Sequence, residues 1–151
     1  MNLARRAWVV TLISLFCNSP FGVACAFGQP KVLGPSYALV GSNLIMVELA
    51  QYENERMVGL SNRDLNSSNS YMIFVFEKPQ VVSFWMKDTR KDLSVAFINS
   101  NNKIMQIENL KAQSLKVIKS KSSYIKYAIE VPKSFFQKKG IKIGDEVIIF
   151  K

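Results

Sequence analysis

From Leu44 onward, the hydrophobic positions occur mainly in short runs whose length and spacing are typical of β-strands. In the run 71–77 (YMIFVFE), apolar residues occupy both alternating faces, as in a strand that is buried on both sides. The runs 93–99 and 103–110 flank a polar turn sequence and are therefore expected to form a hairpin. In total, the pattern predicts strands at 44–50, 71–77, 81–87, 93–99, 103–110, 124–131 and 146–150.

Two short segments between these runs have the end signals of α-helices. Residues 53–60 (ENERMVGL) begin with acidic side chains, which suit the positive end of a helix dipole, and Gly59 suits the C-terminal end. Residues 132–140 place Pro132 at a first helical position and Gly140 just past the end. The sequence therefore predicts a mainly β fold of the α+β class, an antiparallel sheet or small barrel with two short helices.

The first 26 residues have the organisation of a secretory signal peptide. Two arginines, Arg5 and Arg6, precede an apolar run at 7–17, and Ala24 and Ala26 provide the small residues of a cleavage site. A helix as short as this run spans ~16 Å, against ~30 Å of bilayer hydrocarbon, so an uncleaved membrane anchor is the weaker interpretation. We therefore expect an exported protein, periplasmic or secreted, with no transmembrane segment after cleavage.

The N-terminal region also contains a cysteine that could be lipid-modified and a segment that links the signal to the domain. Cleavage after Ala26 would remove both cysteines and leave a mature chain without disulfides. The alternative is lipid attachment at Cys25. Residues 27–43 contain three Gly and two Pro without clear periodicity and are expected to be a linker or N-terminal arm. Residues 44–151 then form a single β-rich domain.

The composition excludes several kinds of chemistry. The chain has 151 residues and no histidine, which rules out Ser-His-Asp triads, Cys–His pairs and His-ligated metal sites. It contains no phosphate-binding glycine loop, and its acidic residues lack the spacing of a calcium loop. We therefore expect no cofactor and no metal, and an enzyme would have to use carboxylates, lysine or tyrosine.

Positive charge is concentrated in the C-terminal part of the chain. The formal net charge is +9, and residues 103–151 hold eleven Lys against four acidic residues, a net of +7. Such an excess could attract anionic lipid, a cell-wall polymer or an acidic protein, or it could simply keep the surface soluble. Nucleic acid is not an expected partner of an exported chain.

The stretch 84–87 (FWMK) is the strongest candidate for a binding surface. Alternation along a strand would turn Trp85 and Lys87 to one face and their neighbours to the core. Trp85 could be covered by a helix, or it could form the flat wall of a cleft beside Lys87. Arg56 or Arg63 could add a guanidinium suited to an anionic small molecule or envelope polymer, although either could equally be a solvated surface cation.

The chain from about residue 44 to 151 resembles the bacterial and archaeal "domain of unknown function 192" family. The resemblance implies a compact β-rich domain that often carries an export signal, and it implies no established activity. Where the family pattern has Asn, this chain has Asp88, and where the pattern has Asp, this chain has Ser94. Asp88 is therefore a further candidate ligand-binding residue. The resemblance is carried by Glu55-Arg56, Gly59-Leu60, Arg63, Phe74-Val75-Phe76, Phe84-Trp85-Met86-Lys87, Thr89, Leu93, Phe97-Ile98, Glu130, Gly140-Ile141-Lys142 and Gly144-Asp145.

Two functions from different classes remain open at this point. The first is a non-catalytic binding or accessory module of the cell envelope that uses an aromatic and basic cleft. The alternative is a carboxylate-dependent hydrolase acting on an envelope substrate, which needs two of Glu55, Asp88, Asp92 and Glu130 within ~5–10 Å of each other. Glu130 precedes Pro132 closely, so we expect it to accept N–H bonds from the start of the following helix.

Overall fold

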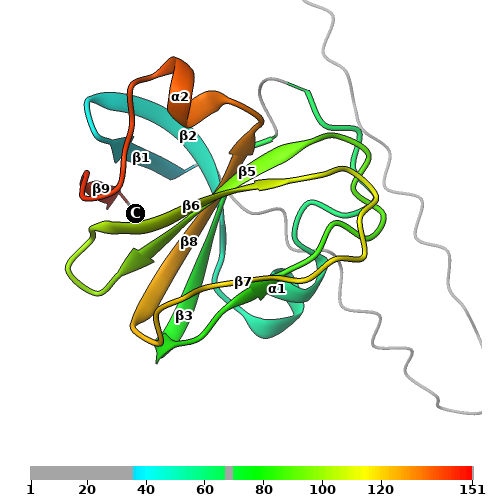
Figure 1. Ribbon diagram of the computed structural model, residues 1–151, viewed down its shortest axis with the longest axis horizontal. Helices are drawn as coiled ribbons and strands as arrows, with labels where there is room; N and C mark the ends of the chain where they lie inside the picture. The colour runs from blue at the N-terminus through cyan, green and yellow to red at the C-terminus, as the bar shows by residue number, and fades with distance from the viewer. Residues whose placement is uncertain (1–35, 67–69, 151) are drawn as a thin grey trace, which may run out of the picture. The chain divides into compact units, whose positions relative to one another are not determined.

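A computed structural model of the protein describes residues 36–66 and 70–150, which form nine strands and two short helices (Figure 1). The mainly β fold predicted from the sequence is confirmed. The strands are β1 (Ser36–Val40), β2 (Asn43–Ala50), β3 (Met72–Gln80), β4 (Ser83–Phe84), β5 (Leu93–Asn99), β6 (Ile104–Leu110), β7 (Ile118–Lys119), β8 (Ile125–Pro132) and β9 (Val147–Phe150), and the helices are α1 (Glu53–Val58) and α2 (Phe135–Lys138).

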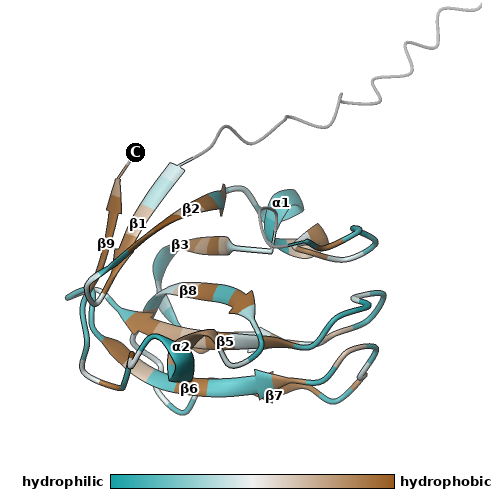
Figure 2. Ribbon diagram, turned by 90° about the horizontal axis from the view of Figure 1, so that it is seen from above, coloured by the Kyte–Doolittle hydropathy of each residue, from teal (hydrophilic) through white to brown (hydrophobic). Residues whose placement is uncertain are grey.

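Seven of the strands form one curled sheet in the order β6-β5-β8-β3-β2-β1-β9, while β4 and β7 pair separately. Figure 2 shows the seven strands following one another around the curve, with α1 beside the ends of β2 and β3. The expected hairpin of β5 and β6 is present and antiparallel. Strands β2 and β3 run parallel, which requires a crossover connection, and α1 lies in that connection.

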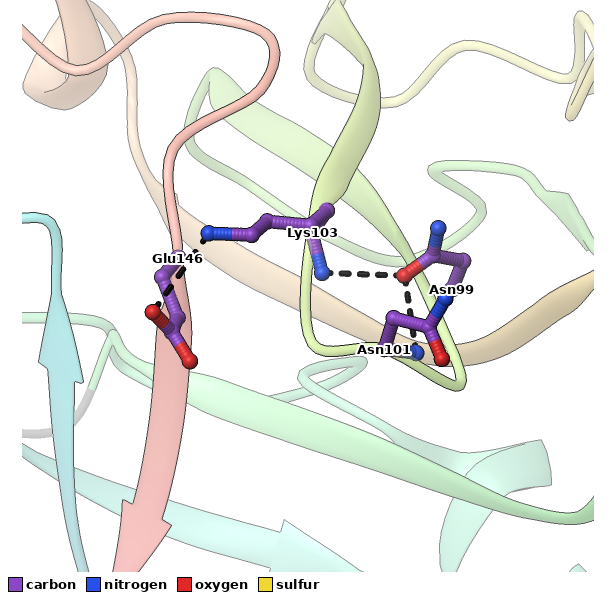
Figure 3. Close-up of polar contacts among 4 residues, drawn as sticks. All are labelled: Asn99, Asn101, Lys103 and Glu146. Atoms are coloured by element: carbon purple, nitrogen blue, oxygen red, sulfur yellow. Dashed lines mark hydrogen bonds and ion pairs between the residues drawn. The ribbon is translucent and has the colours of Figure 1, made fainter.

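The two edges of the curled sheet meet at one end of the molecule. The N–H of Gly144 donates to the carbonyl of Ile104 at 2.8 Å, and the N–H of Val147 donates to that of Asn102 at 2.8 Å. Beside these bonds, Lys103 forms an ion pair with Glu146 at 3.4 Å (Figure 3). The start of β6 is thereby tied to the start of β9, so the sheet is a barrel that closes at this end.

The β5–β6 turn that makes this closure is fixed by one side chain. The Oδ1 atom of Asn99 accepts the backbone N–H groups of Asn101 at 3.0 Å and of Lys103 at 2.9 Å (Figure 3). Asn102 adopts the left-handed conformation, with φ 59°, which asparagine tolerates better than most residues. The polar Asn-rich turn predicted from the sequence therefore has a specific structural basis.

Two hydrophobic clusters pack on the opposite faces of the sheet. The inner cluster takes residues from all seven strands and from Phe135 and Phe136 of α2. The outer cluster covers β3, β5 and β8 with residues that follow α1 or flank β4, such as Leu60, Val82 and Met86. This arrangement explains why the run 71–77, which contains most of β3, is apolar on both faces.

Three boundaries differ from the sequence-based expectation. The first strand, β1, lies inside the segment 27–43 that was expected to be an arm, and its alternate residues Ala38 and Val40 are buried. Of the expected strand 81–87, only two residues form β4, although Val82 and Met86 are buried as the alternation predicted. Pro132 ends β8 instead of starting a helix, and α2 begins three residues later.

Five exposed apolar side chains lie together on the outer face of the β1–β2–β9 part of the sheet. Tyr37 is the direct cross-strand partner of both Met46 and Phe150, and Leu44 and Ile148 both pair with the next outward residue of β1, Leu39. This face is the continuation of the outer face that bears the outer cluster. Exposed apolar side chains gathered on one face often mark an interaction surface.

The predictions for the N-terminal region fall outside the described residues. These are the signal peptide at 1–26, lipid attachment at Cys25 and the first part of the expected arm. Within residues 36–66 and 70–150, neither helix has the length and apolar composition needed to cross a bilayer.

Candidate functional site

A pocket of about 640 Å³ opens between α1, the second half of β3 and the strand β4. We call it the α1–β4 pocket. Four aromatic rings line it, together with small polar side chains such as Ser61, Ser83 and Thr89. Its charged lining residues are three acids and two bases, Glu53, Glu77, Glu130, Arg56 and Lys78, and its aromatic residues are Phe74, Phe76, Phe84 and Trp85.

Glu130 is the most unusual residue of the pocket. It is 4% exposed, and its direct cross-strand neighbours are Met72 on β3 and Val95 on β5, both apolar. Within the described part of the chain, its carboxyl group makes no hydrogen bond or ion pair. Burial alone raises the pKa of Glu130 to about 8, because an apolar environment disfavours the charged form. At neutral pH, the group is therefore mostly a neutral carboxylic acid facing the pocket.

The structural role expected for Glu130 at the start of α2 is wrong. The N–H of Lys133, just after β8, donates to the carbonyl of Asp92 at 3.3 Å. Alternation along β8 turns Glu130 to the outer face, together with Ala128, whereas Phe135 and Phe136 of α2 pack on the inner face. Glu130 and the helix therefore lie on opposite sides of the sheet.

Trp85 lies on the rim of the pocket and is 53% exposed, so the interpretation in which a helix covers it is wrong. Its neighbour Phe84 points the other way, as the alternation predicted. The Phe84 ring packs edge-on against Phe74, with 4.9 Å between ring centroids, and lies 5.9 Å from the ring of Phe97. Phe84 is therefore anchored in the outer cluster, and Trp85 is left available to a ligand.

Arg56 is the one sequence-predicted cation that lines the pocket. Its Nη1 atom donates to the backbone carbonyl of Gln51 and, at 2.9 Å, to that of Val75. Its guanidinium carbon lies 5.6 Å from the centre of the Phe76 ring. Arg56 thus ties α1 to β3, and much of its hydrogen-bonding capacity is used inside the protein.

The other three candidate residues do not line the pocket. Arg63 forms a two-oxygen ion pair with Glu48, at 2.8 and 2.7 Å from its Nη1 atom. The ammonium of Lys87 lies 5.7 Å from the centre of the Trp85 ring, on the exposed side. Asp88 takes the left-handed conformation, φ 57°, and its carbonyl accepts the N–H of Asn62 at 2.8 Å. Since Asn and Asp are both suited to this conformation, the change from the family's Asn preserves the turn.

The carboxylates that a hydrolase would need do not come together, because most of them have structural roles elsewhere. Glu55 caps the start of α1 by accepting the N–H groups of Gln51 at 2.8 Å and Tyr52 at 3.0 Å. Asp92 accepts the N–H of Ala112 at 2.8 Å and pairs with Lys133 at 2.8 Å. Of the four carboxylates named in advance, Glu130 alone lines the pocket.

Ser94, where the resemblance implies an Asp in the family pattern, lies on the opposite face of β5 from the pocket. Its neighbours Leu93 and Val95 belong to the outer cluster, whereas Ala96 belongs to the inner cluster. The hydroxyl of Ser94 donates to Asn109 at 2.9 Å. The departure at this position therefore removes no carboxylate from the pocket.

Sequence reasoning missed several lining residues. Glu53, at the start of α1, and Glu77, in the second half of β3, were not predicted as site residues, although both line the pocket. Gly59 was assigned only a helix-end role, but a side chain there would meet the Phe74 ring at 3.3 Å. Within the described residues, no group of three or more metal-ligating side chains is gathered.

Comparison with known proteins identifies the family but no activity. The chain is similar to the crystal structure of a "putative transcription regulator" from Sinorhizobium meliloti, with 27% identity, a TM-score of 0.71 and coverage of 78% of this chain and 95% of that one. It shares its fold with a protein of unknown function from Novosphingobium aromaticivorans, with 24% identity, a TM-score of 0.69 and coverage of 80% and 89%.

Comparison with curated proteins gives no match. The family model of DUF192, described as "Uncharacterized ACR", matches residues 38–149. The match begins within β1 and ends within β9, and it therefore spans the whole curled sheet together with the α1–β4 pocket. The chain belongs to the DUF192 family.

Proposed function

We propose that the protein is an exported binding module of the cell envelope that holds a small organic molecule in the α1–β4 pocket. The observation that carries the proposal is the state of Glu130, which is buried, lines the pocket and has no hydrogen-bond partner within the described residues. In the described residues no buried side-chain oxygen lacks a partner, so the carboxyl oxygens of Glu130 are not sealed in the core but are accessible in the pocket. A ligand can take the hydrogen bonds that the protein leaves unused there, so the pocket offers a specific polar contact to an occupant.

The shape and walls of the pocket support the same function. Its volume of about 640 Å³ lies within the ordinary range of small-molecule sites. Such sites combine apolar and aromatic walls with a few polar groups, and here Trp85 on the rim and Glu130 inside provide both. Export is supported by the signal-like sequence at residues 1–26, with lipid attachment at Cys25 as the alternative.

Tryptophan fluorescence tests the binding function directly. The chain has two tryptophans, Trp8 and Trp85, so the Trp8→Phe variant reports on the pocket rim alone. Titration with envelope-derived amino acids, amino sugars, short peptides and glycans should produce a saturable fluorescence change for one class, together with a rise in Tm. The same class should bind the Trp85→Ala variant more weakly in calorimetry. No saturable change and no Tm shift across the whole set would contradict the proposal.

The place of the protein in the cell has its own measurement. Mass spectrometry of the chain recovered from the periplasm or medium should give an N-terminus at Phe27. An N-terminus at a lipid-modified Cys25 would support the anchored alternative. Recovery of the unprocessed chain from the cytoplasm would contradict export.

A carboxylate-dependent hydrolase is the second candidate, and one observation favours it. The raised pKa of Glu130, about 8, is that of a proton donor at neutral pH, as in other acid catalysts held in apolar pockets. Hydrolysis would need a second carboxylate, for which the pocket offers Glu53 and Glu77. Release of reducing ends from purified envelope glycans that is lost in Glu130→Gln would support this candidate; its absence would leave the binding module.

A further inference from the structure

The polar lining of the α1–β4 pocket is rich in acceptor oxygens. Three carboxyl groups line it, Glu53, Glu77 and Glu130, against two bases. One base, Arg56, already donates to two backbone carbonyls that fix α1 against β3. With Glu130 neutral, the two carboxylates Glu53 and Glu77 balance the two bases, so the pocket has no excess of positive charge for a phosphate or carboxylate group, and Glu130 adds acceptor oxygens.

The aromatic walls favour a ligand that brings positive charge. The faces of aromatic rings carry partial negative charge and attract cations. Two rings of this pocket already lie beside a cation of the protein, Phe76 beside Arg56 at 5.6 Å and Trp85 beside Lys87 at 5.7 Å. Two further lining rings, Phe74 and Phe84, have no such cation beside them among the described residues, and the pocket thus joins acceptor oxygens to rings that can pack against the apolar part of an organic cation.

We propose that the α1–β4 pocket binds an organic amine, a primary ammonium group on an apolar or aromatic body, with the ammonium placed against the carboxyl group of Glu130. The proposal rests on the binding function proposed above and names its ligand class. The ammonium donates hydrogen bonds to the oxygens of Glu130, which have no other partner in the described residues, and the aromatic rings enclose the body of the ligand. The anionic ligand expected from the sequence is the competing class.

Binding of an ammonium changes the protonation of Glu130. In the free protein at neutral pH, the carboxyl group is mostly protonated, because burial raises its pKa to about 8. An ammonium beside it favours the carboxylate, so the proton of Glu130 leaves to solvent as the ligand binds. Close to one proton should therefore be released per amine bound at pH 7.

This coupling fixes the pH dependence of the affinity. The charged groups that line the pocket around Glu130 are Glu53 and Arg56 on α1, and Glu77 and Lys78 on β3. Below pH 8, the proton on Glu130 must be displaced, so the affinity for an amine should rise by up to about tenfold per pH unit and level off near pH 8. An alkylammonium group like that of lysine stays charged over this range.

Three probes of similar size separate the ligand classes: 2-phenylethylamine, 2-phenylethanol and 3-phenylpropionate. Isothermal calorimetry at pH 6, 7 and 8 should give the tightest binding for the amine, with an affinity that rises with pH. Repeating the pH 7 titration in two buffers of different ionisation enthalpy counts the protons released. This count uses the unmodified protein, so it does not depend on any variant folding.

Two variants connect the effect to Glu130. In Glu130→Gln, the side chain keeps its size but carries no exchangeable charge, so amine affinity at pH 8 should fall at least about tenfold and lose its pH dependence. Glu146→Gln removes a carboxylate of the same kind at the closed end of the barrel, in the ion pair with Lys103, and should leave amine affinity unchanged.

The possible outcomes distinguish the amine proposal from the more general proposal that the pocket binds a small molecule. Tighter binding of 3-phenylpropionate or 2-phenylethanol, or an amine affinity that does not rise with pH, would overturn the amine proposal and leave a binding pocket of another specificity. Weak binding of all three probes, together with a response of the Trp8→Phe variant to non-amine envelope compounds, would also overturn it. Absence of any response to probes and envelope compounds would overturn both.

Discussion

Glu130 on β8 is the direct cross-strand partner of Met72 on β3, so a carboxyl group stands beside a thioether in the middle of an apolar face. A neighbour of this kind offers at best a weak hydrogen bond, and the group can lower its energy only by staying protonated or by meeting a ligand. Selection for stability alone would favour an apolar residue here. The relationship is therefore the clearest sign of function in the described part of the chain.

The first prediction concerns the pH dependence of stability. The pKa of Glu130 is raised from 4.5 to about 8 in the folded protein, so the folded state holds a proton that the unfolded chain has lost. This contribution is fully present below pH 4.5 and is lost as the pH rises toward 8. Glu130→Gln cannot lose such a proton, so relative to the wild type its free energy of unfolding should rise by up to ~4 kcal/mol between pH 5 and pH 9.

Urea unfolding of both proteins at pH 5, 7 and 9 provides this measurement. Glu146→Gln serves as the control, because it removes a half-exposed carboxylate from a surface ion pair, and it should follow the pH trend of the wild type. A constant difference between Glu130→Gln and the wild type across this range would show that Glu130 is not a buried neutral acid.

The second prediction compares two adjacent aromatic residues. Phe84→Ala should lower the free energy of unfolding by ~2–4 kcal/mol, because the ring packs against Phe74 and Phe97 in the outer cluster. Trp85→Ala should change it by no more than ~0.5 kcal/mol, because half of the side chain is exposed. Thermal unfolding measures both. A large loss of stability in Trp85→Ala would show that the Trp85 side chain packs in the core.

The sequence predicted those parts of the fold that leave a pattern in neighbouring residues. The apolar faces of β3 and β5 were visible because both faces of these strands are buried, in the inner and outer clusters. Strand β7 was missed because residues 111–123 are mostly polar and have no strand period. The run 81–87 kept its predicted alternation of burial, yet only β4 pairs within it, because alternation reports which face is buried and not which backbone groups are hydrogen-bonded.

The candidate site was less predictable because its contacts join residues distant in sequence. Arg63 looked like a free cation, but its partner Glu48 lies on the strand before α1. Glu130 looked like a helix cap because Pro132 follows it, whereas its role depends on its register with β3 and β5. A local signal did exist, since an acidic residue on the same strand face as Ala128 breaks an apolar run.

The third prediction concerns the wall of the pocket at Gly59. This residue has φ 51° and ψ −130°, a conformation that residues with a side chain rarely adopt, and an added Cβ would lie 3.3 Å from the Phe74 ring. Gly59→Ala should therefore lower the free energy of unfolding by ~1–3 kcal/mol and weaken ligand binding, since Phe74 would have to shift.

Gly140→Ala is the matched control for this prediction. Gly140 also has a positive φ, 65°, but nothing lies within 4 Å of an added Cβ, so its replacement introduces backbone strain without a clash. Its cost should be ~1 kcal/mol, with ligand binding unchanged. Equal losses of stability in the two variants would mean that the contact between Gly59 and Phe74 contributes nothing.

The fourth prediction concerns acid stability at Asp92, just before β5. The N–H of Ala112 and then the ammonium of Lys133 hold the pKa of Asp92 below its usual value of 3.8. A carboxylate with a lowered pKa contributes stability that is present above the unfolded pKa and is lost as the pH falls through the folded one. Asp92→Asn should therefore be less stable than the wild type at pH 7, and the difference should shrink steadily below pH 4.

Lys133→Gln divides the two causes of this effect. The variant removes the charged partner of Asp92 but keeps the N–H of Ala112, which is the larger cause of the lowered pKa. It should therefore retain part of the acid dependence that Asp92→Asn abolishes. Urea unfolding at pH 7, 4 and 3 measures all three proteins. If Lys133→Gln abolished the dependence as fully as Asp92→Asn, the ion pair and not the N–H of Ala112 would be the main cause of the lowered pKa of Asp92.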